Sequence, residues 1–232
     1  MKKHYLSLAF AALATIASSS ISNAADETAS EQAQSAIDIA FGAAITSNYV
    51  SRGLTLSDDK PAFQAYMEAS YGIVYAGVWG STYDVLDDNK AEIDLSVGIR
   101  PEFGKVSLDI GYARYYYSFD GDCCGEVYAK ADFAATEAIS VGAEIFHDFD
   151  ADATYLRAKG SYALPYDFSL SGGFGGYAQF KQLDWDLGVS KTFKDTFKVD
   201  VRYYGYNDDV DTTHKFVAAL SFDTSLSALS GN

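Results

Sequence analysis

The stretch AEIDLSVGIR, residues 91–100, decides the fold class. Its apolar side chains are Ile93, Leu95, Val97 and Ile99, and the alternating positions hold Glu92, Asp94, Ser96, Gly98 and Arg100. Successive side chains of a β-strand point to opposite faces, so this period of two residues predicts a strand with one apolar and one charged face. Residues 181–190 and 197–204 have the same pattern.

Twelve segments of this kind are expected along the chain, separated by turn signals. They span residues 36–50, 61–72, 74–84, 90–101, 105–118, 125–134, 138–148, 153–164, 167–178, 181–193, 196–207 and 213–223. Tight turns alternate with longer, mostly acidic loops, as in outer-membrane barrels, and an even strand number puts both termini in the periplasm. The sequence therefore predicts an all-β fold, a transmembrane antiparallel up-and-down β-barrel of about twelve strands. A soluble sandwich or lipocalin-like barrel is the less favoured alternative.

The N-terminal residues predict export. Lys2 and Lys3 precede an apolar run over residues 5–17, which is too short to span a bilayer as a helix. Ser22-Asn23-Ala24 offers the small residues that signal peptidase recognises. The expected divisions are a cleaved signal peptide (1–24), a mobile periplasmic tail (25–35), the barrel (36–223) and a C-terminal tail (224–232). The expected location is the outer membrane of a Gram-negative bacterium.

Composition and charge are consistent with a barrel that does not bind nucleic acid. Aromatic residues make up 15% of the chain, with 18 Tyr and 15 Phe, and they suit strands and the aromatic girdles of membrane barrels. The formal net charge is −15, and cleavage of the signal peptide would remove two lysines and no acid. Nucleic-acid phosphates require a basic surface, whereas this balance favours cations.

One segment also resembles a known family. Residues 46–81 read TSNYVSRGLTLSDDKPAFQAYMEASYGIVYAGVWGS. The matching elements are Ser47-Asn48-Tyr49, Arg52-Gly53, Asp58, Lys60-Pro61-Ala62 and the strand from Tyr75 to Ser81. They resemble the TorF-family porins of proteobacteria, a family formerly described as uncharacterised. The resemblance implies an outer-membrane barrel but supplies no substrate and no site residues. Arg52 either pairs with acids at the barrel mouth or is a surface arginine beside a turn glycine.

The charged phase of the strands predicts the pore lining. It comprises Glu92, Asp94, Arg100, Lys130, Asp132, Arg157, Lys159, Asp184, Asp186, Lys198, Asp200 and Arg202, and less securely Asp38, Glu68, Asp109 and Glu144. These charges either line a narrow aqueous path and set its selectivity or pair across the lumen and plug it. An outward Arg114 near one end of its strand is tolerable at the membrane interface, unless a bulge resets the phase.

The longer loops predict an acidic rim outside the barrel. Its members are Asp58, Asp59, Asp87, Asp88, Asp120, Asp122, Asp148, Asp150, Asp208 and Asp209. Residues 148–152 start like a calcium loop, but the glycine and the closing glutamate are missing, so we expect no metal site. Divalent cations could bridge this rim to lipopolysaccharide. Cys123 and Cys124 fall in a predicted loop, and adjacent cysteines leave the state of a disulfide open.

These features predict a porin-like channel for small hydrophilic solutes that prefers cations. The alternative is a non-conducting barrel that acts as a surface receptor, adhesin or structural protein. An enzyme is not expected, because only His147 and His214 follow the signal peptide and no nucleophile-elbow motif occurs. The expected partners are the lipid bilayer, lipopolysaccharide, the barrel-assembly machinery and small solutes or cations. No cofactor is expected.

Overall fold

A computed structural model describes residues 37–82, 91–118 and 121–231, so the expected signal peptide, the N-terminal tail and the rim residues Asp87, Asp88 and Asp120 lie outside the described residues. The larger strands are β1 (Ile37–Thr46), β4 (Ala62–Tyr71), β5 (Val74–Thr82), β6 (Ala91–Ile99), β8 (Val106–Tyr117), β9 (Gly121–Ala134), β10 (Ile139–Asp148), β11 (Ala153–Leu164), β12 (Phe168–Tyr177), β13 (Leu183–Phe193), β14 (Phe197–Asn207) and β15 (Thr212–Ser225). The short elements are β2 (Val50–Ser51), β3 (Leu54–Thr55), β7 (Glu102–Phe103) and α2 (Leu226–Ser230).

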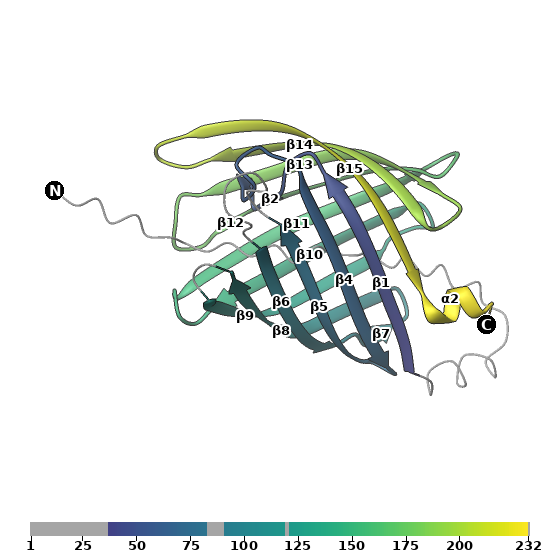
Figure 1. Cartoon of the computed structure of the whole chain (residues 1–232). Helices are drawn as coiled ribbons and strands as arrows, with labels where there is room; N and C mark the ends of the chain where they lie inside the picture. Colours follow the sequence, from purple (N-terminus) through teal and green to yellow (C-terminus); the bar gives the residue numbers. More distant parts are fainter. Residues whose placement is uncertain (1–36, 83–90, 119–120, 232) are drawn as a thin grey trace.

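The twelve larger strands close into one antiparallel barrel (Figure 1). Each pairs with its neighbours in sequence, and β1 pairs with both β4 and β15, which joins the first strand to the last. This confirms the predicted all-β antiparallel barrel and its strand number. Because no strand of the closed barrel is left at an edge, the backbone hydrogen bonds of the wall are satisfied within the wall.

Burial along the strands is inverted relative to a soluble protein. In β6 the outward side chains of Ile93 and Leu95 are 48% and 46% exposed, whereas Glu92 and Asp94 on the inward face are 0% and 1% exposed. An apolar outer face and a charged interior are what a lipid environment requires of a barrel. No helix of the described residues is long and apolar enough to cross a membrane.

Three strand ends differ from the sequence prediction for a structural reason, and other strand ends differ by one or two residues. β1 ends at Thr46, and Val50–Ser51 belongs instead to the small hairpin β2–β3. β9 begins at Gly121, because an irregularity in its register with β8 lets the pairing continue past the cysteines. β15 runs to Ser225, whose side chain caps the short helix α2.

Arg114 follows the outward phase of β8. The irregularity in the β8–β9 register lies beyond it, between Tyr115 and Tyr116, so no bulge turns its side chain inward. The guanidinium group donates to both carboxylate oxygens of Asp122, at 2.6 and 2.8 Å. The first of the two predicted alternatives, an outward arginine near a strand end, is therefore confirmed.

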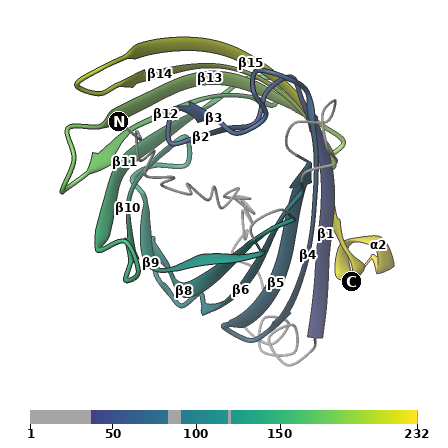
Figure 2. The same cartoon turned by 60° about the vertical axis from the view of Figure 1, so that its left-hand side comes forward.

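We call the barrel end at which β1 begins and β15 ends the turn end, and the opposite end the loop end. The longest described connection at the loop end is residues 47–61, between β1 and β4, and we call it the inward hairpin. Figure 2 shows its strands β2 and β3 inside the ring of barrel strands instead of beyond its rim. The hairpin therefore lies inside the barrel.

Candidate lumen site

The inward hairpin is built around a two-residue turn. Val50 pairs with Thr55 and Ser51 with Leu54, which places Arg52 and Gly53 at the tip. Both tip residues have positive φ, 47° and 81°, as the favoured two-residue hairpin turns require.

Contacts behind the tip fix the base of the hairpin. The buried Ser57 hydroxyl accepts from the backbone N–H of Tyr49 at 2.8 Å, and it donates to the carbonyl of Lys60 at 2.6 Å. The side chain of Asn48 donates to Asp59 at 2.7 Å. The loop is therefore a folded unit and its tip has a defined direction.

The tip reaches the opposite wall of the barrel. Arg52 donates from its two terminal nitrogens to the two carboxylate oxygens of Glu126 on β9, at 2.9 and 2.8 Å. Its guanidinium carbon also lies 5.0 Å from the ring centre of Phe146, 4.5 Å from Tyr155 and 5.5 Å from Tyr177. In the strand order, β9 to β12 are separated from β1 and β4 by about half of the barrel.

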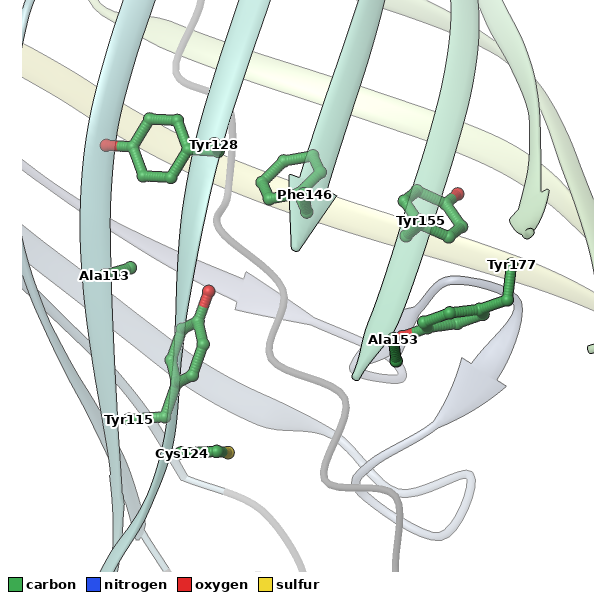
Figure 3. Close-up of a cluster of buried hydrophobic side chains, with 8 residues drawn as sticks. All are labelled: Ala113, Tyr115, Cys124, Tyr128, Phe146, Ala153, Tyr155 and Tyr177. Carbon is green, nitrogen blue, oxygen red and sulfur yellow. The ribbon is translucent and has the colours of Figure 1, made fainter. Parts of the chain in front are cut away.

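We call Glu126, Phe146, Tyr155 and Tyr177 the cation cage. The three aromatic residues come from β10, β11 and β12, and Figure 3 shows them along one stretch of wall. The side chains of Arg52 and Glu126 are only 7% and 6% exposed. Burial lowers the pKa of Arg52, but Glu126 and the surrounding hydroxyls outweigh burial and raise it, so the guanidinium stays charged. Of the two roles that the sequence left open for Arg52, pairing with an acid is confirmed.

The glycine of the tip is pressed against a second part of the wall. A Cβ atom at Gly53 would lie 2.8 Å from the Cβ of Tyr206 on β14 and 3.0 Å from the Cβ of Asp184 on β13. Cβ atoms do not approach so closely, and the positive φ also disfavours any other residue. Gly53 thus lets the tip contact the wall beside the cage.

A buried acidic pair lies below the other side of the hairpin. Glu92 accepts hydrogen bonds from the hydroxyls of Tyr49, at 2.9 Å, and Tyr117, at 2.8 Å. Asp94, two residues along β6, is 1% exposed, and its carboxyl group lies within hydrogen-bonding range of that of Glu92. Two buried carboxylates side by side repel each other, so a cation would be favourable at this position.

Most of the other predicted lining residues form ion pairs along the wall. Arg157 pairs with Asp184 and Asp186, Arg202 with Asp186 and Asp200, Lys159 with Asp132 and Glu144, Arg100 with Glu68 and Asp109, and Lys130 with Asp109. Asp200 lies on the same strand as Arg202, and the other partners lie on strands that are adjacent or next but one. These pairs therefore do not cross the lumen, whereas the pair of Arg52 with Glu126 does.

Three predicted lining residues lie toward the turn end. Arg100 follows the last residue of β6, and its side chain is 45% exposed. Lys198 is exposed near the start of β14. Asp38, a less secure member of the prediction, accepts at the start of β1 from the backbone and hydroxyl of Ser227. These three residues therefore lie away from the part of the lumen that the hairpin narrows.

The deepest charged residues are predominantly acidic. Seven acids, Glu92, Asp94, Glu126, Glu144, Asp148, Asp184 and Asp186, are buried among the described residues, together with one lysine, Lys130. The Arg52 side chain adds one further buried positive charge. The lumen near the hairpin therefore carries a surplus of carboxylates. Among the described residues no set of three or more His, Cys, Asp or Glu side chains is arranged to hold a metal ion.

The predicted acidic rim needs two corrections. Asp122 and Asp148 were expected in loops, but they lie in β9 and at the last position of β10. The reason is local pairing, since Asp122 binds Arg114, and Asp148 accepts from the backbone N–H groups of Asp150 and Ala151. β9 therefore begins before its predicted start, whereas β10 ends at its predicted last residue, which is Asp148 itself.

The remaining described rim residues lie in loops. Asp58 and Asp59 are in the inward hairpin, Asp150 follows β10, and Asp208 and Asp209 follow β14. The hydroxyl of Tyr206 and the backbone N–H groups of Asp211 and Val210 bind Asp208 and lower its pKa. These bonds make the loop after β14 a self-capped turn.

The cysteines form a bond within the strand. Cys123 and Cys124 are joined by a disulfide at the start of β9, not in a loop as the sequence suggested. Cys124 is buried against the aromatic cluster that includes Tyr115, and Leu54 of the inward hairpin packs against the same cluster (Figure 3).

The aromatic half of the cage was missed at the level of sequence. Phe146, Tyr155 and Tyr177 share the inward phase of their strands with charged residues such as Glu144 and Arg157. That position was the available signal, because an aromatic residue on a polar phase points into the lumen and not at lipid. Gly175 gives room for this arrangement, since a Cβ there would overlap the hydroxyl of Tyr155.

Comparison with known proteins supports the fold. Residues 30–229 match the family described as "Bacterial protein of unknown function (Gcw_chp)". No curated protein matches the chain. The solved KdgM porin in complex with disordered oligogalacturonate is similar with a TM-score of 0.59 and 9% identity, over 80% of this chain and 98% of that chain. The NanC porin is similar with a TM-score of 0.53 and 12% identity, over 81% and 99%. At these identities the likeness shows the fold alone, and the TorF-family name stays a prediction.

Proposed function

Because the chain belongs to the Gcw_chp family, whose function is unknown, we propose its activity from its own lumen: an outer-membrane channel for small hydrophilic solutes that prefers cations. The observation that carries the proposal is a closed barrel with an apolar outer face and a charged lumen that one folded hairpin narrows. The porin fold of KdgM and NanC supports it. In this proposal the loop end faces the outside of the cell.

The preference for cations follows from the deep acids. Charges that line a narrow path of low dielectric attract counter-ions and repel ions of like sign. Seven buried acids, against one buried lysine and the buried side chain of Arg52, therefore favour cations over anions near the hairpin. Asp94 is the acid to test first, because it is 1% exposed and no lysine or arginine of the described residues pairs with it.

Single-channel recording under a KCl gradient tests the proposal. We expect the chain, refolded in detergent and inserted into a planar bilayer, to give stable steps with a cation-selective reversal potential. Asp94→Asn should lower the cation-to-anion permeability ratio about twofold, since a change of about 0.4 kcal/mol in ion free energy suffices. Asp208→Asn is the matched control, because it removes the same charge from a loop outside the barrel strands.

The alternative is a non-conducting barrel that serves as a receptor, adhesin or structural protein. The observation that favours it is the hairpin, whose tip is held on the opposite wall by a buried ion pair. A correctly folded, heat-modifiable barrel without current, in both the parent chain and Arg52→Ala, would favour this alternative. Current in Arg52→Ala alone would show that the hairpin closes an otherwise conducting barrel.

A further inference from the structure

We propose that the cation cage is a binding site for guanidinium groups of small solutes and that Arg52 is its tethered occupant. The proposal deepens the channel function and rests on it for the solute's route. The cage is built as a ligand site would be, with one buried carboxylate and three aromatic rings that converge on one planar cation. An arginine of the hairpin fills it in this structure.

The geometry selects a guanidinium group over an ammonium group. Two separate nitrogens of Arg52 donate to the two oxygens of Glu126, at 2.9 and 2.8 Å, which is the fork that a planar guanidinium matches. The hydroxyl of Tyr177 accepts from the same cation. Phe146 and Tyr155 stand with their ring centres within about 5 Å of it. An ammonium ion carries its donors on one nitrogen, so it does not offer two parallel N–H···O bonds together with a flat face for a ring.

Arg52, the occupant of the cage, belongs to a small structural unit, the inward hairpin. The hairpin contains two strands of two residues each, and its tip arginine has a left-handed φ of 47° that non-glycine residues rarely adopt. Other hydrogen bonds from the hairpin to the wall include those of Ser47 with Ala218, of Tyr49 with Glu92 and of Asp59 with Lys215. Tyr49 and Asp59 lie nearer the base of the hairpin than its tip. A solute that competes with Arg52 for the cage would therefore release the tip and leave the contacts of the base in place.

The charge around the cage would also attract a second cation. Arg52 neutralises Glu126, but no lysine or arginine of the described residues pairs with Asp94 on β6. Asp184 on β13 lies on the other side of the tip, near Gly53. An arriving guanidinium solute would therefore meet a net negative environment before it displaces Arg52.

Chemical rescue of Arg52→Ala tests the site. The variant empties the cage, and methylguanidinium chloride serves as the probe in detergent. We expect low millimolar methylguanidinium to raise the unfolding midpoint of Arg52→Ala, with a half-saturating concentration at least about tenfold below that of methylammonium. The double variant Arg52→Ala/Glu126→Gln should lose this response. Arg114→Ala is the matched control, because Arg114 also makes two hydrogen bonds to one carboxylate, from Nε and Nη2 to Asp122, but lies on the outward phase.

The parent chain provides a second measurement that does not depend on whether the variant folds. Methylguanidinium should increase hydrogen exchange of the backbone in residues 47–61, because it competes with Arg52, and equal methylammonium should not. Equal responses to both probes, or no response to methylguanidinium in either measurement, would overturn the proposal. Rescue without current in any variant would retain the site and remove the channel, whereas current without a guanidinium response would do the reverse.

Discussion

Two acidic loops at the same end of the barrel have opposite fates. Residues 47–61 and 208–211 each carry two adjacent aspartates, yet the first folds into the lumen and the second caps itself beside β14. In the second loop Asp208 accepts from Tyr206 and from the backbone, so its charge is satisfied locally. The first loop has in addition a cation at its tip, Arg52, and a buried acid and aromatic rings opposite to receive it.

Acid content therefore does not decide where a loop of this barrel lies. Placing an aspartate-rich loop in a lumen that is already rich in carboxylates is electrostatically unfavourable, since like charges repel. A single buried ion pair of opposite sign, with cation–π contacts, reverses that preference. Both loops contact Tyr206. Its Cβ lies against Gly53 of the first loop, and its hydroxyl donates to Asp208 of the second.

The largest effect on the inward hairpin is expected when Arg52, the cation at its tip, is replaced. Arg52→Ala should release the inward hairpin, because it leaves Glu126 buried and unpaired, a loss of about 3–5 kcal/mol for a buried pair. We expect larger single-channel conductance and faster hydrogen exchange in residues 47–61, with little change in 208–211. Unchanged conductance and exchange would mean that contacts other than the Arg52–Glu126 pair hold the hairpin.

The strands could be predicted from the sequence, whereas the positions of the loops relative to the lumen could not. A period of two residues encodes which face of a strand is apolar, and it located the twelve strands and the inward phase of residues such as Asp94 and Arg157. The cage joins residues that lie far apart, with Tyr177 125 positions beyond Arg52. No local pattern encodes such a contact, so the sequence left two roles open for Arg52.

The same limit explains the misplaced residues of β9. Its start was predicted at 125, because Asp120 and Asp122 placed the residues before it, with Cys123 and Cys124, in an acidic external loop. In the barrel, backbone pairing with β8 extends the strand regardless of side-chain pattern, and the irregularity beyond Tyr115 absorbs the mismatch. Tertiary pairing thus outweighs the local signal at strand ends.

A smaller effect is expected when the tip is changed and the cation kept. Gly53→Ala should cost about 1–2 kcal/mol for the left-handed φ alone, and more because its Cβ would overlap Tyr206 and Asp184. Gly104→Ala separates the two causes, since Gly104 has a φ of 62° but a Cβ added there would meet nothing within 4 Å. Urea unfolding of both variants and exchange in residues 47–61 provide the comparison. Equal losses would contradict a close contact between tip and wall.

The smallest effect is expected in the self-capped loop and depends on pH. The bonds from Tyr206 and the backbone lower the pKa of Asp208, so its carboxylate stabilises the folded loop above the ordinary pKa of about 3.9 and this contribution is lost as the pH falls through the lowered value. Asp208→Asn should remove that acid transition, which amide chemical shifts of Val210 and Asp211 would follow. Residues 47–61 should show the same pH response in the parent chain and the variant, because Arg52 stays charged throughout this range. A changed pH response of residues 47–61 in Asp208→Asn would show that Tyr206 couples the two loops. The two loops would then not be independent of each other.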